Sequence, residues 1–300
     1  MKITAKGKSL MADMSLLLVA IIWGSGFIVN KDMLDFLSPI YILVLRFSSA
    51  SIILGIIFHR RVLKIKRVDL QAGAIMGIFL FLGFFAQIVG MKYTVVSKSA
   101  FITASNVVMV PFLYWFISKK RVESSEIIAA SLCFIGIGIL SLDSKFNLSF
   151  GDGLTFLCAI FFGMHIISVG IFSRKHDPMI LTIIQFAIAG LLSILAGLIF
   201  KVDLIPLTKK MSMSIGYLVI INTILAFSIQ NIAQKYTTST HAAIILSLES
   251  VFGTLFSIIL LYEKPSLRLL FGSAIIFIAI ILAETNFSFL KRSAKEIEEN

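Results

Sequence analysis

One carboxylate lies deep within an apolar segment of the chain. Glu249 follows the run Ala242–Leu248, and Asn106 occupies the matching position of an earlier apolar run. Polar groups at the centre of a membrane helix cost about 2.5 to 3.5 kcal/mol on insertion scales, so we expect both side chains to face a protein interior or a wet cavity. There Glu249 is a counter-charge for a substrate amine or a proton carrier. The alternative is a neutral carboxyl group that hydrogen-bonds within the bundle.

Two further ionisable side chains, Arg46 and His165, interrupt apolar runs. Arg46 either holds a substrate carboxylate, pairs with Glu249 or fixes the bundle, and Gln185 stands at the matching position later in the chain. His165, which matches Gly26, is either a proton relay or a neutral hydrogen-bonding group. A zinc site with Glu249 lacks a third ligand at recognisable spacing. We therefore predict no metal and no cofactor.

Aromatic and amide side chains recur in the same way. Trp23 in the first half of the chain matches Phe162 in the second, and Gln87 matches Gln230. The two aromatic residues lie in the middle of apolar runs, where they either enclose an organic substrate or fill the core. Asn222 adds to an unusually polar segment. The predicted substrate-binding residues are Trp23, Arg46, Gln87, Asn106, Phe162, His165, Asn222, Gln230 and Glu249.

These matches reflect an internal duplication. One set, from Ala20 to Phe47, recurs from Ala159 to Phe186 at one constant offset in residue number, which we call the first offset. Another set, from Gln87 to Ala100, recurs from Gln230 to Ala243 at a larger one, the second offset. The difference indicates a net four-residue insertion, which we place in the polar stretch Lys201–Ser212.

The duplication divides the chain into two parts. The first repeat is residues 1–142, and the second repeat is residues 143–300, which end in a short tail. Duplicated, very apolar chains are typical of secondary transporters, because two repeated halves leave a substrate site at their interface.

The composition is that of a protein whose solvent is lipid. Of the 300 residues, 58% are apolar and only 14% are charged, against about a quarter charged in soluble domains. The net charge of +11 comes from short basic clusters between apolar runs, which favours membrane topology over nucleic-acid binding. Cys133 and Cys158 lie inside apolar runs and are expected to be buried thiols. The apolar run Met14–Val29 resembles a secretory signal, but the first repeat needs it as its opening helix.

Apolar runs between charged or Pro/Gly-marked breaks predict ten membrane helices. With the N-terminus on the first side, 17 of the 27 Lys and Arg fall on that side, nine on the other and one inside a span. This bias predicts that both termini are cytoplasmic. The predicted helices are Met14–Asn30, Pro39–Phe58, Leu70–Gly90, Ser99–Ile117, Ser125–Leu142, Gly153–Phe172, Met179–Phe200, Ser214–Gln234, His241–Leu261 and Leu267–Glu284.

An odd number of helices in each repeat determines how the two repeats are related. With five spans each, the second repeat must enter the membrane from the opposite side to the first. The predicted fold is therefore an all-α integral membrane protein of two inverted five-helix repeats. Such a pair has two asymmetric conformations in which the halves exchange roles, as alternating access requires.

Six short motifs occur along the chain in a specific order. They are Trp23–Phe27, Arg46–Phe47, Lys92–Thr94, Gln234–Thr237, Ala242–Glu249 and Tyr262–Lys264. These motifs make the chain similar to the EamA family of the drug/metabolite transporter superfamily. The resemblance implies ten helices, a central cavity formed by helices 1 to 4 and 6 to 9, and movement of metabolites, often outward, without ATP. Ser250 stands where many members have proline, which predicts a less kinked ninth helix.

We predict a secondary transporter of small organic metabolites in the cytoplasmic membrane, with amino acids or related amphiphilic solutes as substrates and export as the direction. Proton coupling would require Glu249 or His165 to titrate. A flippase of lipids or lipid-linked intermediates is the alternative. An intramembrane enzyme is disfavoured because no nucleophile has a base at helical spacing and no phosphate-cradling loop occurs. The predicted partners are a small-molecule substrate and membrane lipid, without nucleic acid; dimer formation is left open.

Overall fold

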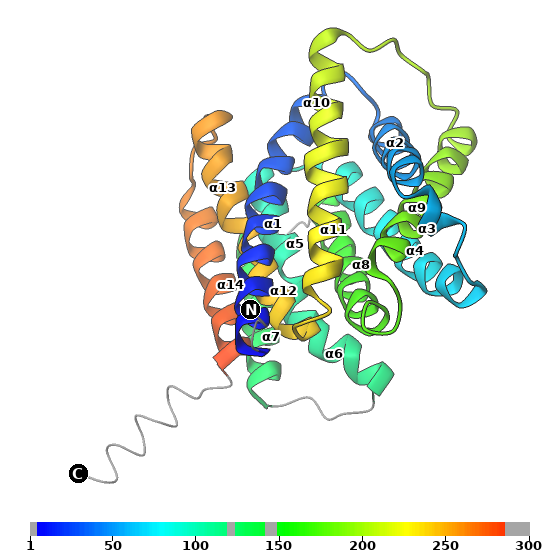
Figure 1. The fold of residues 1–300 in the computed structure, drawn as a ribbon. Helices are drawn as coiled ribbons and strands as arrows, with labels where there is room; N and C mark the ends of the chain where they lie inside the picture. The colour runs from blue at the N-terminus through cyan, green and yellow to red at the C-terminus, as the bar shows by residue number, and fades with distance from the viewer. Residues whose placement is uncertain (1–4, 119–123, 142–148, 286–300) are drawn as a thin grey trace.

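The computed structural model describes residues 5–118, 124–141 and 149–285, and every regular element within them is a helix. The helices pack side by side as a bundle (Figure 1). The first residues of the opening helix and the last residues of the closing helix lie at the same end of this bundle. We call this the terminal end and the opposite one the far end.

The first repeat crosses the bundle five times. Its second pass begins at Pro39, directly after Ser38, whose hydroxyl accepts from the amide of Tyr41; proline suits the first helical position because its missing N–H needs no partner there. Two helices, α5 and α6, together form the fourth pass. The helices are α1 Ala5–Met33, α2 Pro39–Ile57, α3 His59–Val62, α4 Arg67–Met91, α5 Val96–Ala104, α6 Asn106–Ser118 and α7 Ser124–Ser141.

The second repeat has the same plan. Its second pass also begins with a proline, Pro178, behind a capping residue, Asp177, whose carboxylate accepts from the amide of Met179. The third pass contains a π-helix, η1, between two α-helices. The helices are α8 Phe150–Phe172, α9 Pro178–Ile199, α10 Lys209–Val219, η1 Ile220–Leu225, α11 Ala226–Ala233, α12 Ser239–Ser247, α13 Glu249–Leu260 and α14 Leu267–Thr285.

The two repeats are inverted relative to each other. In Figure 1, α1 runs from the terminal end to the far end, whereas its counterpart α8 runs back. Counterparts pack on each other on opposite sides of the bundle, since α2 packs on α9 and α7 packs on α14 (Figure 1). Among the described residues, eight helices are long and apolar enough to cross a membrane, and two shorter apolar helices are Ala130–Ile139 and Leu267–Ala279. The chain is therefore a multi-pass membrane protein with the predicted repeat architecture.

The structure corrects the predicted helices in one respect, because three of the passes are not continuous α-helices. The fourth breaks at Ser105 and the ninth at Leu248, where backbone hydrogen bonds tighten to the third preceding residue. The hydroxyl groups of Ser105 and Ser247 each donate to the carbonyl oxygen three residues before them, at 2.6 Å. Serine groups that compete for the helical carbonyls in this way bend helices. The ninth pass is therefore interrupted although Ser250 stands where a proline would be expected to kink it.

Two glycines allow neighbouring helices to approach closely. A Cβ on Gly24 of α1 would lie 2.6 Å from the Cβ of Phe252 in α13. A Cβ on Gly77 of α4 would lie 2.7 Å from the carbonyl oxygen of Gln185 in α9. Each glycine lies where a helix of one repeat contacts a helix of the other, so these close approaches hold the two repeats together.

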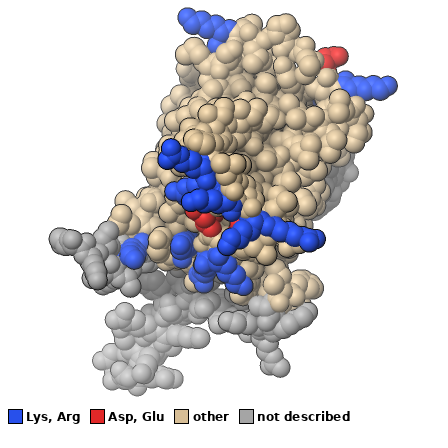
Figure 2. Space-filling model, turned by 45° about the vertical axis from the view of Figure 1, so that its right-hand side comes forward, with Lys and Arg blue, Asp and Glu red and all other residues tan. Residues whose placement is uncertain are grey.

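Charged residues gather towards the ends of the bundle. Figure 2 shows Lys and Arg side chains clustered near the terminal end, around a small acidic patch, below a large uncharged surface. Large apolar side chains such as Leu195 of α9 and Ile52 of α2 are exposed between the charged ends, as expected of helices that face lipid. Exposed basic residues of the terminal end are Arg60, Arg61, Lys64, Lys66, Arg67, Arg174 and Lys175.

Candidate functional site

A cavity lies between the two repeats, beside the breaks in the fourth and ninth passes. It includes eight of the nine residues predicted from the sequence, drawn from both repeats. Its volume of about 40 Å³ holds about three water molecules, so this conformation is too narrow for an organic solute. The lining residues are Trp23, Gly26, Phe27, Asn30, Phe84, Gln87, Asn106, Phe162, His165, Ile166, Asn222, Phe227, Gln230, Leu246 and Glu249.

Asn106 and Glu249 stand at the same point of their passes. Asn106 is the first residue of α6, ten residues after the start of α5 at Val96. Glu249 is the first residue of α13, ten residues after the start of α12 at Ser239. Ten residues span about 15 Å of helix, half the thickness of a hydrocarbon core of about 30 Å. The two side chains therefore lie near the middle of the membrane.

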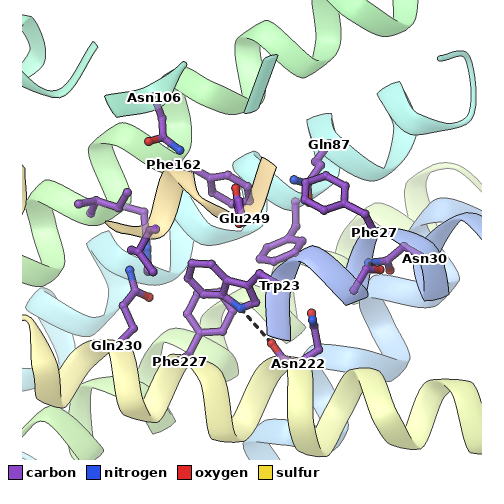
Figure 3. A pocket seen from close by; sticks show the side chains of 15 residues that line it. Trp23, Phe27, Asn30, Gln87, Asn106, Phe162, Asn222, Phe227, Gln230 and Glu249 are labelled. Carbon is purple, nitrogen blue, oxygen red and sulfur yellow. Dashed lines mark hydrogen bonds between the residues drawn. The ribbon is translucent and has the colours of Figure 1, made fainter. Parts of the chain in front are cut away.

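The carboxyl group of Glu249 faces the cavity. Only 7% of the residue is exposed, and Figure 3 shows its side chain between those of Phe162, Gln87 and Trp23. Within the described part of the chain, no side chain or backbone group hydrogen-bonds or ion-pairs with this carboxyl group. A buried carboxyl group without a partner is costly, which favours a ligand or water as its missing partner.

Amide side chains around the cavity also have oxygens without partners. Asn30 donates from Nδ2 to the carbonyl oxygen of Gly26 at 2.8 Å, and Gln230 donates from Nε2 to Gln234 at 2.9 Å. The side-chain oxygens of Asn30, Asn106 and Gln230 are buried and accept no hydrogen bond in the described structure. Such groups need water or a bound molecule to complete their hydrogen bonding.

Aromatic rings around the cavity follow the duplication. The ring centroids of Trp23 and Phe227 are 4.8 Å apart, and those of Phe162 and Phe84 are 5.0 Å apart. Because Phe162 matches Trp23 and Phe84 matches Phe227, the two contacts are equivalent. Each repeat thus contributes one half of an aromatic lining with approximate twofold symmetry.

The structure does not place Arg46 among the residues that line the cavity, and its contact with substrate stays a prediction. Arg46 is fully buried, and its Nη2 donates to Oδ1 of Asn222 at 2.6 Å while Nε donates to the hydroxyl of Thr223. The guanidinium also lies over the ring of Phe84, 4.2 Å from its centroid. Both hydrogen-bond acceptors belong to the π-helix η1. Arg46 therefore supports the cavity wall from behind, which is the structural role that the sequence left open.

His165 is likewise bound to the protein. Its Nε2 lies 3.0 Å from Oε1 of Gln185, and the residue is only 2% exposed. Gln185 is the residue that matches Arg46 in the first repeat, so the two matched positions support opposite walls. His165 lines the cavity with one ring nitrogen already occupied, which fits a neutral hydrogen-bonding group.

Matching polar contacts lie at the two ends of the bundle. Asp13 and His241 approach to 3.2 Å at the terminal end, and Asp152 and Lys98 to 3.5 Å at the far end. Asp13 and Asp152 are related by the first offset of the duplication, and Lys98 and His241 by the second, so the pairs are equivalent. Asp152 also accepts a hydrogen bond from Thr94. The chain is thus connected across both ends in this conformation.

Two further contacts join helix ends to equivalent loops of the two repeats. Lys31, near the end of α1, donates to the carbonyl oxygen of Thr94 at 3.0 Å. Arg174, directly after α8, donates to the carbonyl oxygen of Thr237 at 2.7 Å. Thr94 and Thr237 are equivalent at the second offset. In each repeat, a basic side chain therefore holds the loop between the third and fourth passes of that repeat.

Sequence reasoning missed four prominent lining residues. Phe84 and Phe227 are identical, are related by the second offset and precede the matched glutamines by three positions, so the repeat spacing contained the signal for them. Asn30 stood at the end of a predicted helix, where a polar residue draws little notice. Phe27 was noted only as the last residue of the motif Trp23–Phe27 and not as a candidate for the cavity lining.

Comparisons with known proteins agree over both repeats. The model of a family described as the EamA-like transporter family matches residues 10–142 and 149–285. An "Uncharacterized transporter" of Archaeoglobus fulgidus is 36% identical over 276 residues, which cover 92% of this chain and 86% of that protein. A second "Uncharacterized transporter" of this organism is 24% identical over 282 residues, with coverages of 89% and 95%.

A solved structure resembles the whole bundle. It is described only as a crystal structure of a protein, and it superposes with a TM-score of 0.68 over 93% of this chain and 98% of its own. The sequence identity is 17%. At that identity the likeness concerns the fold alone.

Proposed function

Because the chain belongs to the EamA-like transporter family of the drug/metabolite transporter superfamily, we propose that it is a secondary transporter of small organic metabolites that works by alternating access. The observation that carries this proposal is the position of Glu249. Its carboxyl group, which has no partner among the described residues, faces a cavity near the middle of the membrane, between two inverted repeats. Substrate sites of repeat-based transporters lie at such interfaces.

The matched contacts at the two ends support alternating access. Asp13 and His241 connect the terminal end, and the equivalent Asp152 and Lys98 connect the far end. Because the pairs are equivalent, a conformation that breaks one and keeps the other has a counterpart with the roles exchanged. The narrow cavity fits an intermediate in which both ends are connected, and substrate enters when one end opens.

The lining supports amphiphilic solutes as the substrates, with amino acids and related metabolites as the class that we propose. Glu249 provides a counter-charge for an amine. Aromatic rings such as those of Trp23 and Phe227 provide an apolar surface for the rest of the solute. Burial of the apolar part and pairing of the amine together supply the binding free energy.

We propose the cytoplasmic membrane as the location, with both termini in the cytoplasm and export as the direction. The excess of Lys and Arg on the terminal side supports this orientation. Proton coupling, where it occurs, is proposed to run through Glu249 rather than His165, because Gln185 already occupies one ring nitrogen of the histidine. Movement of protons with substrate into proteoliposomes, absent in Glu249→Gln, is the expected sign of such coupling.

Two other classes of function are less well supported. A flippase would carry an acyl chain, whereas the polar atoms that lack partners gather around a narrow enclosed cavity. Competition by soluble amino acids separates the two proposals, since a lipid substrate would not be displaced. Membership of a transporter family favours transport over catalysis.

Metabolite profiling tests the proposed function. We expect overexpression of the full chain to change the level of particular small metabolites between cytosol and medium, and Glu249→Gln to abolish the change. Asp203→Asn is a matched control, because Asp203 is exposed in the loop after α9. Identical metabolite profiles with the wild-type chain and with Glu249→Gln would contradict the proposal.

A further inference from the structure

We infer that, within the proposed class of amphiphilic solutes, the cavity prefers primary amines and other small organic cations that carry no carboxylate and binds them more tightly than amino acids. This inference rests on the proposed function and narrows its substrate class. It concerns the charged groups of the solutes that the cavity binds. The residues that decide it are Glu249, Arg46, His165 and the aromatic lining.

Among the fifteen described residues that line the cavity, Glu249 carries the one acidic side chain, and none is Lys or Arg. Any full charge that Glu249 brings to the cavity is therefore negative. The carboxylate has no partner within the described structure, so an ammonium group that enters the cavity gains an ion pair without displacing an existing one. An ion pair in a site without bulk water is much stronger than one at the surface.

Arg46, the cation that the sequence offered to a substrate carboxylate, lies behind the lining. Its guanidinium donates to Asn222 and Thr223 and lies against the ring of Phe84, while Nη1 is buried and has no partner among the described residues. Asn222 and Phe84 line the cavity, whereas Arg46 does not. His165 has one ring nitrogen engaged by Gln185. A bound carboxylate would therefore face Glu249 across the cavity with only neutral groups to hold it, which is unfavourable for both charges.

Neutral oxygens add to the preference for a donor-rich ligand. The side-chain oxygens of Asn30, Asn106 and Gln230 are buried and accept no hydrogen bond in the described structure. An ammonium group has three N–H donors and no acceptor. The buried acceptor oxygens around the cavity therefore favour a ligand that brings N–H donors.

The rings complete a site for an organic cation. Trp23, Phe27, Phe84, Phe162 and Phe227 line the same cavity as Glu249. Aromatic faces attract ammonium groups, and the attraction increases when water is excluded. The rings also cover the apolar body of the ligand. An amine with a small apolar body thus finds a counter-charge and an apolar surface in one place.

Three compounds that share a phenylethyl group test the inference. 2-Phenylethylamine carries only an ammonium group, 3-phenylpropionate only a carboxylate, and L-phenylalanine carries both. Binding is measured by the fluorescence of Trp23 in the full-length Trp115→Phe variant, since the chain has two tryptophans and Trp115 lies outside the cavity. Transport is measured separately by counterflow of each labelled compound in proteoliposomes.

We expect the amine to bind about 100-fold more tightly than L-phenylalanine, because burying an unpaired carboxylate costs several kcal/mol, and we expect no binding of 3-phenylpropionate. Glu249→Gln should weaken amine binding at least about tenfold, whereas Asp203→Asn should not change it. Binding of L-phenylalanine as tight as that of the amine would overturn the inference, as would amine binding that survives Glu249→Gln.

Amine binding without counterflow would support the inference and contradict transport, whereas counterflow of L-phenylalanine without amine binding would contradict the inference and leave transport standing.

Discussion

The rings of Phe84 and Phe227 meet edge to face with their centroids 6.0 Å apart. The two residues occupy equivalent positions of the duplicated chain. Phe84 packs on Phe162 of the second repeat, and Phe227 packs on Trp23 of the first repeat. The approximate twofold axis between the repeats therefore passes close to this pair. Alternating access requires two conformations in which the repeats exchange roles. We expect these two rings to lie at the centre of both.

The first prediction concerns the central rings. Phe227 is 2% exposed and contacts Phe84, Phe186 and Trp23. Phe227→Ala should lower stability by about 3 to 5 kcal/mol, as is typical of buried phenylalanines. Thermal unfolding of the purified chain in detergent measures the change. Phe271→Ala is the control because Phe271 is 63% exposed on α14, and equal losses in the two variants would contradict this account.

The second prediction compares two helical glycines. A Cβ at Gly24 would lie 2.9 Å from the backbone nitrogen of Gly253, so Gly24→Ala should separate α1 from α13 and lower the unfolding temperature. At Gly55 no atom lies within 4 Å of the added Cβ. Gly55→Ala should therefore raise stability by up to about 1 kcal/mol through helix propensity. A neutral effect of Gly24→Ala would show that the helices do not contact as closely as described.

The third prediction assigns Arg46 to the wall of the cavity. Arg46→Lys cannot bind both Asn222 and Thr223 in the same way, so it should lower stability by about 1 to 3 kcal/mol. The preference among substrates should be unchanged, because Arg46 does not line the cavity. Arg60→Lys on the exposed surface is the control. Unaltered stability with selective loss of carboxylate-bearing substrates would instead make Arg46 a substrate ligand.

The sequence predicted most of the architecture for a physical reason. In lipid, each polar residue within a helix requires an explanation, so Glu249, Asn106 and the matched glutamines stood out in apolar runs. All four line the cavity in the structure. The repeat spacing predicted the inversion. Whether these residues bind substrate stays a prediction.

The features that the sequence did not predict depend on contacts between residues distant in the chain. The depth of Arg46 followed from its position, but the direction of its side chain depends on Thr223, which is 177 residues away. The π-helix at Ile220–Leu225 and the breaks at Ser105 and Leu248 leave the overall hydropathy of each run unchanged. Hydropathy therefore predicts a pass through the membrane and not its irregularities.

The fourth prediction uses the equivalence of Asn106 and Glu249. Glu249→Asn should abolish transport, because the cavity then lacks its carboxylate. Adding Asn106→Glu restores a carboxylate at the equivalent position of the other repeat, and counterflow should return in part. Asn106→Glu alone should impair transport, since two carboxylates in one enclosed cavity repel each other. A double variant as inactive as Glu249→Asn, although folded, would contradict the functional symmetry of the site.

The central claim is that one cavity opens to each side of the membrane in turn, and thiol labelling tests it most directly. Leu246, which lines the cavity, is changed to cysteine in a Cys133→Ala, Cys158→Ala background, and a membrane-impermeant reagent is applied from either side of oriented vesicles. Asp152→Asn weakens the far end and Asp13→Asn the terminal end, so each should shift the population towards the conformation open at that end. We predict that Asp152→Asn speeds labelling from the far side and slows it from the terminal side, and that Asp13→Asn does the reverse. Rates that rise together from both sides, or that change from neither, would contradict alternating access.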